Sequence, residues 1–228
     1  MTTIFPSPAE QYLLELTNRI RLDPENELSR ILSSRDREIN DALDYFNTDL
    51  SVLQQQWTTL EAAPPLAWSG ELHNSAETHN QGMIAADTQS HFLPDEPGLL
   101  DRMRAAGYEP SSVAENIFAY PESIEAAHAG FALDWGVGPH GIQEPAGHRI
   151  SMTNSLYREV GIDITEERNP QTSVGTLVVT QHFGVDRNAI WGMGDAYLLG
   201  VVYSDTTKDD DFYTPGEGLG NVTITASD

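Results

Sequence analysis

The sequence predicts a domain of the α+β class. Apolar residues recur at helical spacing over much of the first 154 residues, whereas residues 159–164 and 176–183 have the β-branched, alternating pattern of strands. The two strand segments follow each other closely in the chain, so we expect them to pair. Helices concentrated in one part of a chain and strands in another are typical of α+β folds.

The first helix is expected from residue 8 to about residue 23. Ser7 and Glu10 have the spacing of a capping box, and Pro8 stands at the first helical position. Leucines then recur at helical spacing, and Pro24 favours an end to the helix. A helix with one apolar stripe of this kind packs against a core.

Further helices are expected along the next hundred residues. A polar helical pattern at 39–60 indicates an insertion packed on the main body, and it ends at a pair of prolines. Ser69 is a suitable cap for a long helix, whose inner face would include His79 as a core histidine. The other expected helices cover residues 70–86, 99–106, 123–133 and 148–154.

The last part of the chain differs from the rest in composition. Residues 198–203 and 221–225 have the composition of strands, and they flank an acidic, turn-rich loop. We therefore expect residues 1–190 to form the main domain. Residues 191–228 would be a C-terminal β-hairpin docked on that domain, or a truncated β-sandwich module, because two strands alone are marginally stable.

Composition excludes several kinds of partner and chemistry. The 228 residues include 12 basic and 35 acidic side chains, for a net charge of −23, so nucleic acid and anionic membranes are not expected partners. No cysteine is present, which excludes disulfides and thiol catalysis. Metal ligands must then come from His, Asp, Glu and carbonyl groups.

The sequence also bears on location. Residues 1–6 show no basic region followed by an apolar run, so an N-terminal signal peptide is not expected, and no apolar segment is long enough to span a membrane. We expect a secreted or cell-surface protein, a monomer and a fragment of a longer chain, exported by a route without an N-terminal signal peptide. An ordinary cytoplasmic acidic protein is the alternative.

Histidines, carboxylates and glycines recur in an ordered set of motifs between residues 90 and 184. Brought together by a fold, such groups make a polar pocket that could hold a divalent cation or transfer protons. The motifs are Ser90-His91-Phe92, Glu115-Asn116-Ile117, Gly147-His148-Arg149, Glu159-Val160-Gly161-Ile162 and Gln181-His182-Phe183-Gly184.

In this order the motifs resemble the CAP superfamily, which comprises cysteine-rich secretory proteins, antigen 5 and pathogenesis-related proteins. The bacterial branch is the closer likeness, and the resemblance covers roughly residues 8–185. It implies a CAP-type α-β-α sandwich with a central antiparallel sheet. It also implies a groove lined by a tetrad of two histidines and two acids.

Carried over residue by residue, the resemblance gives His91 as the first histidine, Glu115 as the first acid and His148 as the second histidine. The remaining acid stays open among Asp134, Glu144 and Glu159, because a glycine stands where eukaryotic members have a glutamate. The groove would bind a ligand such as a lipid, a glycan or a peptide.

The tetrad could also hold a metal. His91 and His148 could bind zinc, with a carboxylate and a water completing the site. A metal-dependent hydrolase is then the alternative function, with Glu115 or the second acid as general base. The simpler interpretation is a hydrogen-bonded network that stiffens the groove.

A second candidate metal site lies in the C-terminal acidic loop. Its hard oxygen ligands suit calcium, although Lys208 stands where an acid would be expected. Calcium binding here would make the chain a calcium-stiffened structural module of a larger surface protein, and the alternative is a solvated acidic turn. The candidate calcium ligands are Asp205, Asp209, Asp210, Asp211 and Glu217.

Three other residues have structural interpretations. His182 alternates with its strand neighbours and is expected to face solvent or the groove rim. Asp101 and Arg102 suggest a local ion pair or a helix cap. Trp135 is expected in the core.

Overall fold

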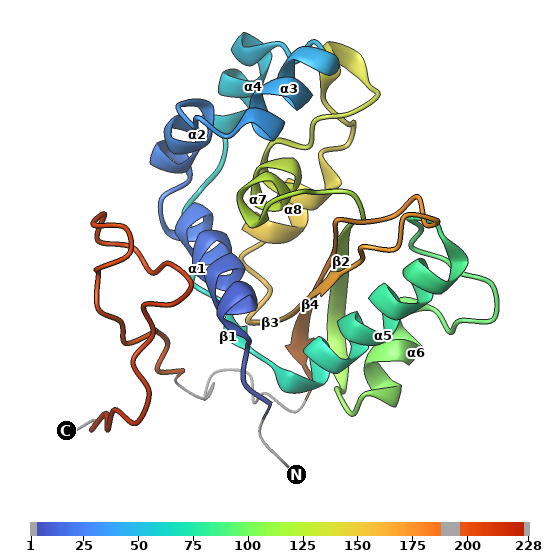
Figure 1. Cartoon of the computed structure of the whole chain (residues 1–228), viewed down its shortest axis with the longest axis vertical. Coiled ribbons are helices and arrows are strands. Elements are labelled where there is room, and N and C mark those ends of the chain that lie inside the picture. Colours follow the sequence, from blue (N-terminus) through green and yellow to red (C-terminus); the bar gives the residue numbers. More distant parts are fainter. Residues whose placement is uncertain (1–3, 188–196, 226–228) are drawn as a thin grey trace.

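The computed structural model describes residues 4–187 and 197–225, and it shows a four-stranded sheet between two layers of helices (Figure 1). The strand order is β1-β3-β4-β2. The strands are β1 (Ala67–Trp68), β2 (Pro110–Phe118), β3 (Glu159–Glu166) and β4 (Leu177–Asp186). The α+β class expected from the sequence is therefore confirmed.

The sheet is mixed. β3 and β4 pair antiparallel, as expected for residues 159–164 and 176–183, and β2 adds to β4 antiparallel at the edge of the sheet. β1 pairs with β3 in parallel through Ala67 and Glu159. The three long strands therefore form the expected central antiparallel sheet, and only the short β1 departs from it. β1 is parallel because helix α5 follows it directly and carries the chain away from the sheet instead of turning back as a hairpin.

One face of the sheet is covered by α5 (Gly70–Ala86) and α6 (Leu99–Ala105) (Figure 1). Ser69 caps α5 by accepting a hydrogen bond from the backbone N–H of Leu72. The helix lies very close to β3, because a Cβ on Gly161 would be only 2.0 Å from the backbone nitrogen of His73. Glycine at this position lets the start of α5 rest directly on the strand.

The opposite face is covered by α1 (Pro8–Leu22), α7 (Ile124–Leu133) and α8 (Gly147–Thr153) (Figure 1). The predicted capping box of α1 is formed by Ser7 and Glu10. α7 is apolar all round and is buried throughout its last turns, so it fills the space between α1 and the sheet.

Arg21 joins α1 to α8. Its guanidinium is fully buried, and among the described residues its hydrogen-bond acceptors are backbone carbonyl oxygens and no carboxylate. Two of these, from Met152 and Asn154, lie at the C-terminal end of α8. The cation therefore satisfies carbonyl groups that the helix itself leaves unpaired.

Three short helices form a subdomain beyond α7, namely α2 (Pro24–Leu32), α3 (Arg37–Tyr45) and α4 (Leu50–Trp57). The helical pattern expected at 39–60 is split in two, because Asn47 adopts a left-handed backbone conformation with φ of 50°. Asp49 then caps the second helix by accepting from two backbone N–H groups.

A buried carboxylate, Glu27, anchors this subdomain to α1 and α7. It accepts hydrogen bonds from Arg19 and from Nε2 of His128, the latter at 2.8 Å. Burial would raise the pKa of Glu27, but the hydrogen bonds from His128 and Arg19 outweigh it and hold the pKa at about 2.

Glu27 is expected to make the protein acid-sensitive. Its folded pKa of about 2 lies below the ordinary value of 4.5, so its stabilisation is complete above pH 4.5 and is lost as the pH falls towards 2. The shift corresponds to about 3 kcal/mol. Urea unfolding of wild type and Glu27→Gln at pH 7 and pH 3 should show a gap that narrows at pH 3. An equal gap at both pH values would contradict this assignment.

The C-terminal segment 197–225 docks on α1. Phe212 lies under the guanidinium of Arg19 at 4.3 Å and meets the ring of Tyr12 edge-on, while Tyr213 is buried in the main core. The expected strands 198–203 and 221–225 are not formed, and an isolated bridge between Tyr203 and Gly218 takes their place. Side-chain packing on α1 stabilises this segment instead of a strand ladder. Residues 188–196, which include the proposed boundary near residue 190, lie outside the described part.

Candidate functional site

The candidate site is organised by two neighbouring residues of the edge strand β2. Glu115 pairs with His182 of β4 and points to the face that α5 and α6 cover. Asn116 points to the opposite face, where its amide donates to the carbonyl oxygen of His148 and to Gln181, both at 3.1 Å. Adjacent residues of one strand therefore contact the two sides of the sandwich.

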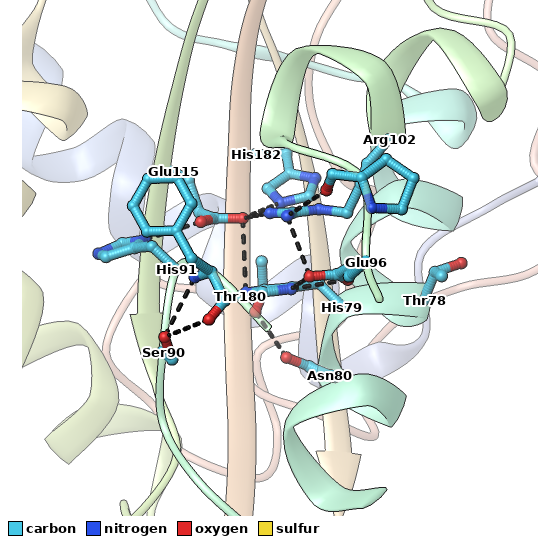
Figure 2. A network of polar contacts seen from close by, with 12 residues as sticks. Thr78, His79, Asn80, Ser90, His91, Glu96, Arg102, Glu115, Thr180 and His182 are labelled. Carbon is cyan, nitrogen blue, oxygen red and sulfur yellow. Dashed lines mark hydrogen bonds and ion pairs between the residues drawn. The ribbon is translucent and has the colours of Figure 1, made fainter. Parts of the chain in front are cut away.

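Glu115 is the centre of a polar network (Figure 2). Its Oε1 accepts from Nδ1 of His91 at 2.7 Å, and its Oε2 accepts from Nε2 of His182 at 2.7 Å and from Arg102. The Glu115 side chain is 4% exposed, whereas that of His91 is 46% exposed. His91 is thus the member of the network that reaches solvent.

The network continues beneath the surface. Arg102 also donates to Glu96 at 3.1 Å, and Nδ1 of His79 lies 2.9 Å from the same carboxylate. Nε2 of His79 lies 3.7 Å from Oε2 of Glu115, which closes a ring of alternating acidic and basic groups (Figure 2). His79 is wholly buried, as expected for a core histidine.

Two expectations about this region are wrong. His182 does not face solvent or the groove rim but is completely buried, because α5 and α6 cover the sheet face towards which it points. Arg102 does not pair with Asp101, which instead accepts from Arg104 at 3.3 Å. Arg102 lies on the inner side of α6 and contacts Glu115, while Asp101 lies on the outer side.

The electrostatics of the network fix its protonation. Burial would raise the pKa of Glu115, but hydrogen bonds from His182 and His91 hold it well below its usual range. Burial lowers the pKa of His182, against the opposing effect of Glu115. Since an ionised carboxylate only accepts, His91 must donate through Nδ1, which leaves its Nε2 lone pair free for a ligand or a proton.

A second histidine and carboxylate form a similar pair on the other side of β2. Nδ1 of His148 lies 2.6 Å from Oδ1 of Asp134, and the Asp134 side chain is 1% exposed. Asp134 also accepts from the backbone N–H of Arg149 at 2.8 Å, so it fixes the first turn of α8. Because Asp134 engages Nδ1 of the His148 ring, Nε2 is the ring nitrogen left for a ligand, as in His91.

Of the acids left open by the sequence, Asp134 is the one hydrogen-bonded to a tetrad histidine. Glu159 lies on β3 and accepts a hydrogen bond from the hydroxyl of Tyr108 at 2.8 Å. Burial raises its pKa. Its described interactions place it in the packing of β3 against the residues that precede β2, not beside His91 or His148.

A cleft of about 910 Å³ opens next to His148. Its walls come from α3, the end of β2, α7 and the loop after α7, and His91 and Glu115 do not line it. Trp135 belongs to this wall and is otherwise in the core, as expected. The aromatic side chains that line the cleft are Tyr45, Phe46, Phe118, Tyr120, Phe131 and Trp135.

Metal ligands converge elsewhere. In the described part of the chain, Glu10, His73 and Asp163 form the group of at least three candidate ligand residues whose donor atoms lie within 4.8 Å of one another. His91 and His148 belong to no such group. Zinc in the groove therefore stays a prediction that rests on the two free Nε2 atoms.

The acidic loop holds itself together through backbone N–H groups. Oε1 of Glu217 accepts from three of them, at Thr206, Thr207 and Lys208, and Oε2 accepts from Thr214. These amides occupy the oxygens that a calcium ion would need.

The remaining acids of the loop are also engaged in part. Asp205 accepts from the backbone N–H groups of Asp210 and Asp211, and Lys208 pairs with Asp210 at 2.8 Å. Calcium at Asp205, Asp209, Asp210, Asp211 and Glu217 stays a prediction, and a Tm that calcium leaves unchanged would contradict it.

Comparison with solved structures finds several similar chains at low sequence identity. An extracellular protein with an SCP domain from Bacillus anthracis str. Ames is 22% identical, with a TM-score of 0.43, over 64% of this chain and 39% of that chain. Venom allergen-like protein 4 of Schistosoma mansoni is 12% identical, with a TM-score of 0.46, over 79% and 90% of the two chains. An outer surface protein of Borrelia burgdorferi is 11% identical, with a TM-score of 0.42, over 68% and 96%.

The family of the chain is shown by comparison of its sequence with family models. No curated protein sequence matches this chain significantly. Within the residues that the structure describes, no helix combines the length and the apolar character needed to cross a membrane. The model of the cysteine-rich secretory protein family, abbreviated CAP, matches residues 14–183, which is most of the chain and includes every tetrad candidate. The chain therefore belongs to the CAP family.

Proposed function

We propose that this protein is a ligand-binding module that takes the apolar part of a small or extended ligand into the cleft beside His148. The aromatic lining of the cleft supports this proposal, because a cleft of this size with a predominantly apolar surface is typical of small-molecule sites. His148 and Gln143 are the polar side chains best placed to orient a ligand there.

The charge of the residues that line the cleft bears on the class of ligand. Glu38, Asp41 and Glu122 line it together with one cation, Arg37, so the lining carries three negative charges and one positive charge. The chain as a whole carries a net charge of −23. An uncharged or cationic head group is therefore favoured over a carboxylate or phosphate.

The test uses matched ten-carbon probes at concentrations below micelle formation. Decanol and decyltrimethylammonium are expected to change the tryptophan fluorescence through Trp135, and decanoate to bind at least about tenfold more weakly. Absence of binding by all three probes would contradict the proposed function. Equal binding of all three would leave the cleft as the site but overturn the charge argument.

A matched pair of variants locates the binding. Tyr45 lines the cleft and is 82% exposed, while Phe5 lies outside the cleft and is 78% exposed. Tyr45→Ala should weaken decanol binding by about threefold to tenfold, because apolar contact area is lost. Phe5→Ala should leave the affinity unchanged, and an equal effect of both changes would argue against the cleft.

A metal-dependent hydrolase is the second candidate function. It is favoured by the two histidines whose Nδ1 atoms are held by Glu115 and Asp134, because histidines that ligate metals usually donate their other ring N–H to a carboxylate. His91 and His148 would hold the ion through Nε2, and bound zinc supplies an acidified water. Glu115 and Asp134 would keep the two rings oriented.

Zinc titration separates the two functions. His148→Ala should abolish one equivalent of zinc binding, whereas His140→Ala, which removes a 54% exposed histidine paired with Asp49, should not. Zinc binding that is the same in wild type and His148→Ala would remove the basis of the hydrolase proposal. The ligand-binding proposal does not depend on the outcome.

We also propose that the protein acts outside the cell or at its surface. The acidic, cysteine-free composition and the extracellular protein among the similar structures support this. Protease added to intact cells that express the native gene should degrade the protein, or the protein should appear in the medium. Retention in the cytoplasm with full protection would contradict the proposal.

A further inference from the structure

Three titratable side chains converge at a place that neither the cleft nor the Glu115 network uses. Glu10 lies in the first turn of α1, His73 in the first turn of α5, and Asp163 in the middle of β3. One donor atom of each lies within 4.8 Å of the others. Glu10 and Asp163 are each only 6% exposed.

In each of the two carboxylates, only one oxygen accepts a hydrogen bond from the described residues. Oε2 of Glu10 accepts from the backbone N–H of Ser7 at 2.7 Å, and Oδ2 of Asp163 accepts from Asn80 and Thr165, both at 2.6 Å. No hydrogen bond to Oε1 of Glu10 or Oδ1 of Asp163 is present in the described ranges. Each carboxylate thus keeps one oxygen available for a further partner.

Their negative charge is poorly compensated. Neither Glu10 nor Asp163 has a lysine or arginine within ion-pair distance among the described residues, and the nearest basic group is His73, with Nδ1 at 3.5 Å from Oε1 of Glu10. Two buried carboxylates near each other are costly without a cation or a proton.

The histidine is already oriented. Its Nδ1 lies 2.8 Å from the carbonyl oxygen of Ile162, so this nitrogen now carries a proton and donates it. The ring also lies beside Trp68, with centroids 5.3 Å apart. Even a fully protonated His73 would balance only one of the two carboxylates.

From this convergence of Glu10, His73 and Asp163 we infer a divalent transition-metal site of the zinc class, separate from the groove. Two carboxylate oxygens and one imidazole nitrogen are a ligand set that zinc accepts, with water completing the coordination. Binding through Nδ1 of His73 releases the proton that now goes to Ile162, so the ion replaces one proton and supplies the missing charge.

The position of the site indicates what the metal would do. Glu10, His73 and Asp163 come from α1, α5 and β3, and none of them lines the cleft. On one edge of β3 the two-residue β1 pairs only with the first residues, so most of that edge has no neighbouring strand. An ion held by all three side chains would connect the start of α1 to the start of α5 across this edge. The role is therefore structural.

The test is titration of the metal-free full chain with Zn²⁺ alone at pH 8, by calorimetry and by thermal unfolding. Wild type should bind one equivalent at this site and gain several degrees in Tm. Asp163→Asn should weaken zinc binding at this site at least about tenfold and remove the Tm gain. His148→Ala should keep the zinc affinity of this site and the Tm gain, because His148 belongs to the groove.

A second variant protects the test against misfolding. His73→Gln leaves both carboxylates in place and removes only the nitrogen ligand, and it should also weaken the binding step at least about tenfold. Zinc binding and a Tm gain that survive both Asp163→Asn and His73→Gln would overturn the inference, as would a wild type that shows no specific zinc step. Loss of the step in His148→Ala alone would assign the metal to the groove instead.

Discussion

Glu115→Gln is expected to lower the free energy of unfolding by about 3 kcal/mol at pH 7. The carboxylate accepts from three donors, on His91, His182 and Arg102, and a hydrogen bond to a charged group contributes about 1.5–3 kcal/mol. The glutamine amide has one acceptor oxygen and would place its own N–H groups against at least one of the three donors.

Urea unfolding at pH 7 and pH 3 measures this loss. The pKa of Glu115 is held below its usual range, so its stabilisation is complete above the ordinary pKa of 4.5 and declines as the pH falls. The gap between wild type and variant should therefore shrink at low pH. Glu61→Gln, at an exposed position, serves as the control and should change little. A loss below about 1 kcal/mol for Glu115→Gln would mean that the network contributes little to stability.

Arg21→Met is expected to cost about 3–5 kcal/mol, because each buried carbonyl oxygen that loses its donor costs about 1–3 kcal/mol. Burial, with the charge of Arg158, lowers the pKa of Arg21 to about 10, so the guanidinium is still charged at pH 7. The variant leaves four buried or part-buried carbonyl oxygens without their donor, those of Pro64, Met152, Asn154 and Tyr157.

Arg21→Met should also weaken ligand binding in the cleft. Arg21 holds the C-terminal end of α8, and the first turn of that helix carries His148. Decanol should therefore bind Arg21→Met more weakly even under conditions where the variant is fully folded. Arg158→Met removes an exposed arginine that donates to Ser155, and it should alter neither stability nor binding. If Arg21→Met and Arg158→Met behave alike, the hydrogen bonds of Arg21 to the end of α8 do not support the cleft.

The elements that the sequence predicts well are those whose signals are local. The capping box of Ser7 and Glu10, the Ser69 cap and the alanine-rich α7 each determine their own helix start or apolar face. β3 and β4 were also predictable, because their β-branched residues alternate and their connection is short.

Other elements depend on distant contacts. β2 contains the adjacent polar residues Glu115 and Asn116, which break the strand alternation because polar groups on both faces serve the site. Residues 198–203 show the opposite case, since they have strand composition but find no neighbouring strand to complete a ladder.

The candidate site was predictable in outline only through the resemblance. The motifs implied His91, Glu115 and His148, and the structure places Glu115 against His91 and Asp134 against His148. Strand alternation alone predicts an exposed face for His182, and this prediction is wrong. In an α-β-α sandwich both faces of the sheet are covered, so the inward direction of His182 could have been inferred.

Arg102 and Glu96 carried no such signal. Arg102 is followed two residues later by another arginine, and only the packing of α6 determines which of them turns inward. Glu96 lies in the connection before α6, where the sequence gives no periodicity to place it. Their roles depend on three-dimensional proximity to Glu115.

The placement of Glu115 and Asn116 on opposite faces of one edge strand has a consequence for how such a protein can change over evolutionary time. Insertion or deletion of one residue within β2 would exchange the faces of these two side chains and separate both histidines from their strand contacts in a single step. Length changes in the loop between β3 and β4 would leave the register of β2 intact. Related chains should therefore vary in loop length while the length of this strand stays constant.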